Sequence, residues 1–296
     1  MNSSIHTNLD SVRNYNVFNK NQAAASKAMS HATTGLKIAS VTDGPASWAI
    51  SEKMRERINS LNQASQNIQN DTALAKTAGD GIANTVEILR TLKAKIIQGA
   101  DAATNDDDRN IIATEITNLL AQINDNANNV KYNGKALLNG TYANESGDGV
   151  ATSSDGAGTS TFSFQVGEDS GMKVKLDIKS VSVKGLGIET SLSGITGTKL
   201  KTMGKAESIV DKLNTALGNA LSAATTVGSI QNRLGYTADN VNTQIENLQA
   251  SDSAIRDADM AKEISDYLKW NVLSQASQYM LAQSNQNAFS VLNLLQ

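Results

Sequence analysis

The positions of glycine and proline divide this sequence into two flanks that can form long helices and a middle that cannot. Thirteen of the 21 glycines fall between Gly134 and Gly204. No glycine precedes Gly35 or follows Gly235, and the only proline is Pro45. Glycine favours turns, and proline interrupts helices. We therefore expect long helices in both flanks, with turns and short strands between them.

The longest predicted helix begins near Pro45, where Asp43 and Gly44 are suitable capping residues. Proline is tolerated in the first helical turn because the amide hydrogen that it lacks has no helical partner there. Apolar residues then recur at spacings of three, four or their sums, which predicts a helix over residues 45–98 with one apolar face. This face comprises Met54, Ile58, Leu61, Ile68, Ala75, Ile82, Val86, Leu89 and Ile96.

Two further helices are predicted from the same period. One follows Asn105, has aspartates at 106–108 in its first turn, and carries the apolar residues Ile112, Ile116, Leu119, Ile123 and Val130. The aspartates suit the positive end of a helix dipole, whereas metal binding, the alternative, is disfavoured because consecutive helical residues point in different directions. The other helix follows the glycine-rich middle. Its apolar residues are Leu213, Leu217, Ala220, Ala224, Val227, Leu234, Ala238, Val241, Ile245, Leu248 and Ile255.

Helices of matching period in both halves of the chain predict a mainly α fold, a long antiparallel bundle that joins the N-terminal half to the C-terminal half. Small β-hairpins are expected in the middle. Asn133-Gly134 is a strong signal for a tight hairpin turn. A second hairpin is predicted from the alternation of Phe162, Phe164 and Val166, followed by that of Val174, Leu176 and Ile178. Residues 141–160 have no period, and we expect an exposed loop there.

Both ends of the chain lack glycine and are rich in Asn, Gln, Ser and Ala. Their apolar residues are Ile5, Leu9, Val12, Val17 and Phe18 at the start, and Ile264, Leu268, Val272, Leu273, Met280, Leu281, Phe289, Val291, Leu292, Leu294 and Leu295 at the end. Chain termini are usually polar, so apolar residues at both ends predict burial against a partner. We expect both ends to be disordered in the free monomer and helical in an assembly, where a partner offsets the entropy of ordering.

Composition argues against several functions. The 26 basic and 29 acidic residues are nearly balanced, which does not favour nucleic-acid binding. No stretch of 18 apolar residues predicts a membrane-spanning helix, and the first ten residues lack the pattern of a secretory signal. The chain has no cysteine, and its two histidines, His6 and His31, are not spaced as in a helical metalloprotease motif. We expect no enzymatic activity, no cofactor and no bound metal.

Motifs at both ends resemble those of bacterial flagellins. They are NVFNK at residues 16–20, TGLKI at 34–38, IRDADMAKE at 255–263, LAQSNQ at 281–286 and VLNLL at 291–295. The segment 116–138 also fits, and the resemblance covers roughly the first 140 and the last 135 residues. It implies a structural subunit that polymerises into the flagellar filament for motility. It also implies that the chain is exported unfolded by the flagellar type III apparatus, without a cleaved signal, to the extracellular flagellum.

The resemblance also implies a division of the chain. Residues 1–44 and 256–296 would form an inner core of terminal coiled coils, in which the apolar residues of both ends make the assembly contacts. Residues 45–140 and 206–255 would form the outer-core helices and a hairpin. Residues 141–205 would hold an exposed loop and the outer-core β-hairpin, with no separate surface domain. Serines and threonines between Thr141 and Thr161 are candidate O-glycan acceptors, although an unmodified loop is the simpler interpretation.

The partners implied by the resemblance are further copies of the chain, an export chaperone, the cap and the hook-associated proteins. The innate immune flagellin receptor is a further implied partner. The region that it reads usually has an arginine, then a glutamate and a leucine three and four residues later, before a glutamine. The equivalent residues here are Leu89, Arg90, Thr91, Ala94, Lys95 and Gln98. Aligned on Gln98, the arginine is replaced by Thr91 and Arg90 is one place out of register. Loss of a guanidinium is not conservative, so we expect weak receptor signalling.

Two other kinds of protein are considered. A hook–filament junction protein, which is built on similar terminal coils, is the nearer alternative, although such relatives usually match the middle motif weakly and are longer. A cytoplasmic signalling coiled coil would not explain apolar chain ends on either side of a strand-rich centre.

Overall fold

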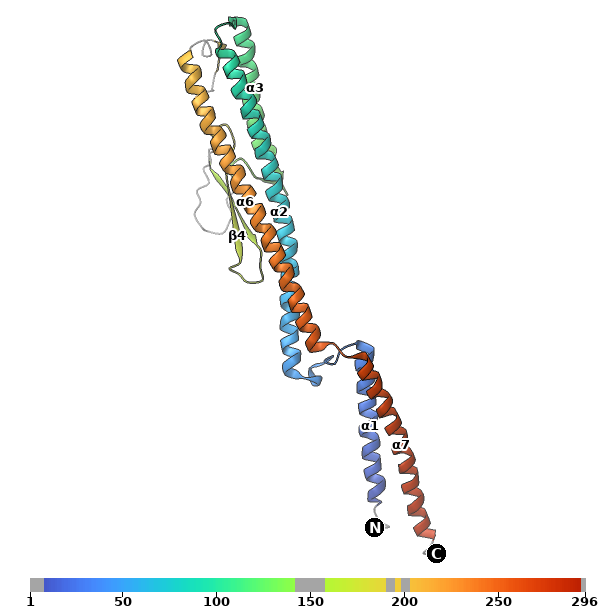
Figure 1. The fold of residues 1–296 in the computed structure, drawn as a ribbon. Helices are drawn as coiled ribbons and strands as arrows, with labels where there is room; N and C mark the ends of the chain where they lie inside the picture. Colours follow the sequence, from blue (N-terminus) through green and yellow to red (C-terminus); the bar gives the residue numbers. More distant parts are fainter. Residues whose placement is uncertain (1–7, 142–157, 190–194, 198–202, 294–296) are drawn as a thin grey trace. The chain divides into compact units, whose positions relative to one another are not determined.

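A computed structural model of the chain describes residues 8–141, 158–189, 195–197 and 203–293. The fold is mainly α, as predicted (Figure 1). The helices are α1 (Leu9–Thr34), α2 (Pro45–Ala100), α3 (Asp106–Asn129), α6 (Met203–Arg256) and α7 (Met260–Asn293), with a short 3₁₀ helix η1 (Val41–Asp43) between α1 and α2. The strands are β1 (Lys131–Tyr132), β2 (Lys135–Ala136), β3 (Thr159–Gln165) and β4 (Lys173–Lys179).

The contacts between residues divide the chain into two compact units. Residues 59–245 form one, which we call the bundle unit, and residues 1–58 with 246–296 form the other, which we call the terminal unit. The chain enters and leaves the bundle unit once each, so the terminal unit is built from both chain ends. The predicted division into inner-core and outer-core segments stays a prediction.

In the bundle unit, α2 packs against α6 in antiparallel orientation. Ser65 Oγ donates to Asn242 Oδ1 at 3.3 Å, and Lys93 Nζ donates to Asn214 Oδ1 at 2.7 Å. The partners of successive α2 residues therefore move backwards along α6, which is the antiparallel pairing of the two halves that the shared period predicts. Figure 1 shows α3 returning alongside α2.

The contact between α3 and α2 is anchored by an amide inside the bundle unit. The Nδ2 of Asn126 donates to the carbonyl oxygen of Gly81 and to Thr85 Oγ1, both at 2.8 Å. Helix α3 starts after Asn105 as predicted, and the Asn105 side chain caps it by accepting a hydrogen bond from the amide of Asp107. The buried Arg109 donates to the carbonyl oxygen of Gly99, in the last turn of α2, and to that of Asp101, which follows α2, and so closes this turn.

The core of the bundle unit is aliphatic. Its largest fully buried side chains are Leu61, Ile68, Ile82, Leu89, Leu92, Ile96, Ile116, Ile123, Leu137, Leu138, Leu176 and Ile178. Of the residues predicted for the outer-core bundle, those buried are Leu61, Ile68, Ile82, Val86, Leu89, Ile96, Ile116, Ile123, Leu213, Leu234 and Val241. Those half-buried are Met54, Ile58, Leu119, Leu217, Ile245 and Leu248. These residues thus lie on the inward faces of their helices, Met54, Ile58 and Leu248 within the terminal unit, and their role as an outer core stays a prediction.

Both predicted hairpins are present. Strands β1 and β2 are joined by Asn133 (φ 49°) and Gly134 (φ 77°), whose positive φ values are those of the tight turn that Asn-Gly favours. Strands β3 and β4 pair antiparallel with Phe162 opposite Leu176, and their alternate residues are buried. Most of the predicted exposed loop, and with it most candidate glycan acceptors, falls in residues 142–157, outside the described residues.

In the terminal unit, α1 and α7 are helical and pair with each other, which differs from our expectation that both ends are disordered in the free monomer. Asn8 Nδ2 donates to the Ser284 carbonyl oxygen at 3.3 Å, and Asn14 Nδ2 donates to that of Met280 at 3.4 Å. The physical reason for the difference is that each end supplies part of the surface that the other lacks. Among the described residues, no helix is both long and apolar enough to cross a membrane.

Candidate functional site

The interface between α1 and α7 is made of small and polar side chains. The residues buried there include Asn21, Ala28, Ser274 and Ser277. Asn21 Nδ2 donates to Ser277 Oγ at 2.9 Å, and Ser274 Oγ donates to Gln22 Oε1 at 3.2 Å. Small side chains let helices approach closely, and the hydrogen bonds satisfy the polar groups that the approach buries. This interface therefore uses little of the apolar material of either helix.

The large apolar residues of α1 and α7 face outward instead. Leu9, Leu268 and Val272 are 63%, 57% and 64% exposed. We call the following residues the terminal apolar set: Leu9, Val12, Val17, Ile264, Leu268, Val272, Leu273 and Met280, all of which are exposed. Among the other predicted assembly residues, Phe18 and Leu281 are half-buried. Ile5, Leu294 and Leu295 lie outside the described residues, as do the side chains of Val291 and Leu292.

The α1–α7 pair exposes its large apolar residues to solvent, which is unusual for a protein that stays monomeric. Water-facing helices of globular proteins usually bury their apolar stripe and expose polar residues. Concentrated exposed apolar residues mark interaction surfaces, and burying one such side chain contributes about 1.5–3 kcal/mol. The terminal apolar set can therefore bind other apolar surfaces with substantial free energy.

A group of charged residues joins α1 to the segment before α2. Lys27 Nζ lies 2.9 Å from Asp43 Oδ1, and the amides of Ala39 and Ser40 donate to Asp43 Oδ2 at 3.3 and 3.1 Å. The hydrogen bond from Lys27 is the main cause that holds the pKa of the Asp43 carboxyl far below its usual range, and the Ser40 amide adds to it. Asp43 was singled out from the sequence as a capping residue, but its partner Lys27 was not.

A second polar contact joins the end of α6 to the start of α2, within the terminal unit. The buried Arg256 donates from Nη1 to Glu52 Oε1 at 2.9 Å and to Ser51 Oγ at 3.4 Å. The amide of Lys37 donates to the Arg256 carbonyl oxygen at 2.7 Å, and that of Ala258 donates to the Gly35 carbonyl oxygen at 2.8 Å. The two sequence motifs at residues 34–38 and 255–263 are thus in direct contact, which sequence reasoning did not predict.

The residues predicted for receptor recognition lie on α2. Leu89 is buried in the bundle core, whereas Arg90, Thr91, Ala94 and Gln98 are exposed. The guanidinium of Arg90 lies 3.4 Å from Glu87 Oε2, and Lys95 Nζ lies 2.8 Å from Glu115 Oε2 on α3. The structure contains no receptor, so the expected weak recognition stays a prediction.

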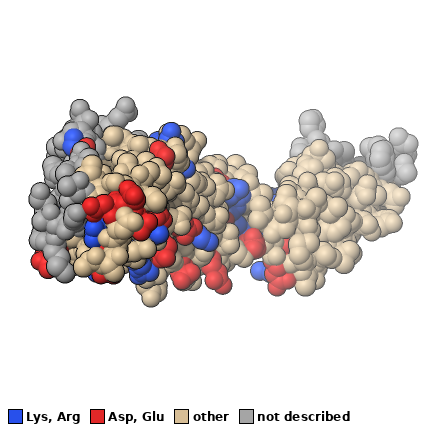
Figure 2. Space-filling model, turned by 90° about the horizontal axis from the view of Figure 1, so that it is seen from above, with Lys and Arg blue, Asp and Glu red and all other residues tan. Residues whose placement is uncertain are grey.

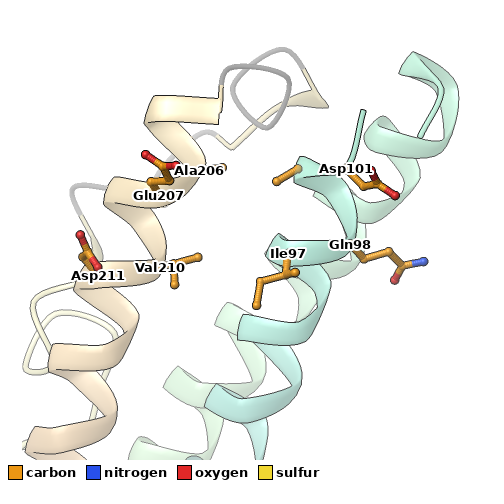
Figure 3. Close-up of a pocket in the computed structure, with 8 residues that line it drawn as sticks. Ile97, Gln98, Asp101, Ala206, Glu207, Val210 and Asp211 are labelled. Carbon is orange, nitrogen blue, oxygen red and sulfur yellow. The ribbon is translucent and has the colours of Figure 1, made fainter. Parts of the chain in front are cut away.

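The bundle unit has a hollow of about 720 Å³ between the end of α2 and the start of α6. Figure 3 shows Ile97 and Val210 projecting toward this space, while Gln98, Glu207 and Asp211 point away from it. Polar groups do not converge there as they do in catalytic pockets. Among the described residues, no cluster of three or more His, Asp or Glu side chains is arranged to hold a metal ion. Figure 2 shows basic and acidic side chains interspersed on the visible face.

Comparisons with known proteins match both ends of the chain to family models. Residues 5–143 match the family model of the bacterial flagellin N-terminal helical region, and residues 209–295 match that of the bacterial flagellin C-terminal helical region. A flagellin of Bacillus subtilis is 34% identical and is aligned over 98% of this chain and 99% of its own length. The flagellar filament 33 kDa core protein of Treponema phagedenis is also 34% identical, over 91% of each chain.

A solved structure shares the fold. That of a putative flagellar hook-associated protein from Vibrio parahaemolyticus aligns with a TM-score of 0.60 at 15% identity. The alignment covers 73% of this chain and 100% of that one. At this low identity the likeness concerns the fold alone.

Proposed function

Because this chain belongs to the bacterial flagellin family and is a structural subunit of the flagellar filament, we propose that it polymerises through the terminal apolar set of α1 and α7. The observation that supports this proposal is the outward orientation of that set. The α1–α7 pair satisfies its polar groups internally and leaves Leu9, Leu268 and Val272 more than half exposed. Neighbouring subunits would supply the surface that covers them.

Contacts of this kind lead to a filament rather than a closed ring. When one surface of a subunit binds a different surface of the next copy and the rotation does not close, the assembly grows as an open helix. The terminal apolar set is distributed over both α1 and α7, so one subunit can contact several neighbours. Each buried side chain then adds to the cohesion of the polymer.

The test uses Leu268, which is exposed and makes no contribution to the bundle unit. Leu268→Asp places a charge where the proposal requires an apolar contact, so seeded polymerisation should be abolished while the helical circular dichroism of the monomer is retained. Leu268→Met keeps the apolar character and is the matched control, which should polymerise nearly as the parent does. Normal filaments from Leu268→Asp would overturn the proposal.

The hook–filament junction alternative is less well supported than the filament subunit. A flagellin aligns over 98% of the chain at 34% identity, whereas the hook-associated structure shares the fold at 15% identity. Electron microscopy of the purified protein separates the two, because a filament subunit forms long filaments on its own seeds. Short or absent polymers under those conditions would favour a junction protein.

Further parts of the proposal follow from family membership. The chain would be exported unfolded by the flagellar type III apparatus into the extracellular flagellum. It would contact an export chaperone, the cap and the hook-associated proteins, and would have no catalytic activity. Expression in cells with and without a functional flagellar export apparatus tests the route. The chain should reach the medium only when that apparatus is present.

We also propose that signalling through the innate immune flagellin receptor is weak. The support is chemical, because an exposed threonine at residue 91 cannot make the paired hydrogen bonds of a guanidinium. A reporter-cell assay should show low potency for the parent chain and a higher potency for Thr91→Arg. Full potency of the parent would refute the proposal.

A further inference from the structure

A small cavity of about 220 Å³ lies in the bundle unit, between α2 and the two hairpins. Asp71 lines it from α2, and Tyr132 and Lys135 line it from the β1–β2 hairpin. Phe162 and Phe164 line it from β3. This cavity is separate from the larger hollow at the end of α2, because the two have no lining residue in common.

The carboxyl of Asp71 has no partner in this cavity. Its Oδ2 atom is buried and makes no hydrogen bond with the described residues, and burial is the cause that raises the pKa of the carboxyl to about 6. A buried carboxylate is normally paired or hydrogen-bonded, because leaving it unpaired costs free energy. At neutral pH the folded chain therefore holds an anion that a cation from outside could compensate.

Lys135 is not that cation, although it lines the same cavity. It is an exposed residue, and it does not lower the pKa of the Asp71 carboxyl. An ammonium group close to a carboxylate lowers the pKa of the carboxyl, so the two side chains are not an ion pair. The position beside the Asp71 carboxyl is therefore open to another positive group.

The size and the aromatic wall of the cavity limit what it can hold. Pockets for small molecules usually measure about 300–1,000 Å³, so 220 Å³ admits only a short chain. Phe162 and Phe164 are 4% and 5% exposed, and their rings stack with centroids 6.5 Å apart. Such rings offer apolar surface to an alkyl chain, and aromatic rings also attract cations. The ligand that suits these walls is small, apolar at one end and positively charged at the other.

We propose that this cavity is a binding site for a primary alkylammonium group, with the Asp71 carboxylate as its counter-ion and Phe162 and Phe164 against its alkyl chain. An ammonium group carries three N–H donors, and its hydrogen bonds to a carboxylate are about twice as strong as neutral ones. A neutral alcohol of the same length fills the same space without the charge, so it binds more weakly. This inference does not depend on the terminal apolar set.

The probe is n-butylammonium chloride, added at pH 7.5 and constant ionic strength to the full chain kept monomeric. Saturation-transfer NMR gives the apparent dissociation constant. The parent should bind the probe roughly ten-fold more tightly than Asp71→Asn does, and roughly ten-fold more tightly than it binds n-butanol. Asp80→Asn removes an exposed carboxyl of the same helix and should bind as the parent does. Equal binding by the parent and Asp71→Asn, or no binding to the parent, would overturn the proposal.

A free amine and a lysine of a second copy carry the same group, and a second measurement distinguishes them. Seeded polymerisation of the parent and of Asp71→Asn is followed with and without saturating n-butylammonium. If a lysine of the next copy enters the cavity, the amine slows growth of the parent and not of Asp71→Asn. If the cavity takes free amines, growth of the parent is unchanged. The binding measurement uses the monomer, so its result stands whether or not the chain polymerises.

Discussion

Asn21 on α1 and Ser277 on α7 form a buried hydrogen bond, in which Asn21 Nδ2 donates to Ser277 Oγ at 2.9 Å. The same hydroxyl donates to the carbonyl oxygen of Leu273 at 2.7 Å, so it both accepts and donates a hydrogen bond. Polar contacts thus define how the two chain ends pair, while the exposed apolar side chains remain available to other subunits. In the proposed assembly, pairing and subunit contacts therefore use different faces of the same helices.

Asn21→Ala should weaken the terminal unit because it removes this bond and leaves a small void between α1 and α7. We expect a loss of about 1–2 kcal/mol in the free energy of unfolding. The measurement is urea denaturation followed by the fluorescence of Trp48 and Trp270, which both belong to the terminal unit. Asn19→Ala is the matched control, because Asn19 is exposed on the same helix and its change should stay within about 0.5 kcal/mol. Equal losses in both variants would mean that the buried bond contributes nothing specific.

Two arginines contact the same carboxylate oxygen. Comparing them tests how burial of the arginine changes the contribution of such a contact to stability. Arg256 Nη1 is 2.9 Å and Arg55 Nη1 is 3.2 Å from Glu52 Oε1. The Arg256 side chain is 9% exposed and that of Arg55 is 54% exposed. Arg256→Met should cost about 2–3 kcal/mol, since it also removes the contact to Ser51, whereas Arg55→Met should cost less than about 1 kcal/mol. The same fluorescence titration compares them, and a larger loss in Arg55→Met would contradict this ranking.

The parts of the fold that local sequence determines were predictable. Helix α3 begins where Asn105 caps it, and the β1–β2 turn forms where Asn133-Gly134 allows positive φ. The pairing of α1 with α7 was predicted only as part of an assembly. Its interface consists of residues such as Asn21 and Ser277, whose spacing produces no apolar period. The apolar residues that do stand out in these helices point away from the interface.

The polar contacts that join distant segments of the terminal unit could not be predicted, for a different reason. His31, Asp43 and Glu263 are brought together only by the folded path of the chain, and the last is more than 200 residues from the others. Arg256 and Glu52 are separated by 204 positions. A single sequence does not show which distant charges meet. The motifs at residues 34–38 and 255–263 could be recognised from the sequence because they resemble flagellin motifs. The contact between them could not be predicted from the sequence.

We expect the stability of the bundle unit to depend on pH through the carboxyl of Asp71. Burial raises the pKa of its carboxyl from 3.8 to about 6, and its Oδ2 atom is buried without a hydrogen-bond partner. The neutral form is favoured in the folded state, so the bundle unit is most stable below pH 3.8 with respect to this group, and stability falls as the pH rises to about 6. At pH 7.5 the folded chain must hold a charged carboxylate in this place.

Asp71→Asn should therefore stabilise the bundle unit at pH 7.5. Asp71 as a residue is half-buried, so solvent screening limits the gain to about 1 kcal/mol. The gain should disappear at about pH 3, below the usual pKa of 3.8, where the parent carboxyl is neutral in both the folded and the unfolded chain. Urea denaturation followed by far-ultraviolet circular dichroism measures both values. Asp80→Asn, at an exposed position of the same helix, should change little, and an equal gain there would show that general charge reduction is the cause.

Two helical glycines of the bundle unit should respond to alanine with opposite signs. A Cβ on Gly81 of α2 would lie 2.7 Å from Leu138 Cδ1 and 3.0 Å from Val130 Cγ2, whereas a Cβ on Gly235 of α6 would meet nothing within 4 Å. Leu138 is fully buried, so it has little room to move. Gly81→Ala should therefore cost about 1–3 kcal/mol through overpacking, although alanine is the better helix former.

Gly235→Ala should instead gain up to about 1 kcal/mol, because alanine lowers the entropy of the unfolded chain and meets no obstacle. Both variants keep the helix and differ only in what surrounds the added methyl group. Urea denaturation monitored at 222 nm gives the two changes in unfolding free energy. A higher unfolding free energy in both variants would mean that the side chains of Leu138 and Val130 move aside without loss of stability. The β1–β2 segment would then pack less tightly on α2 than its buried side chains indicate.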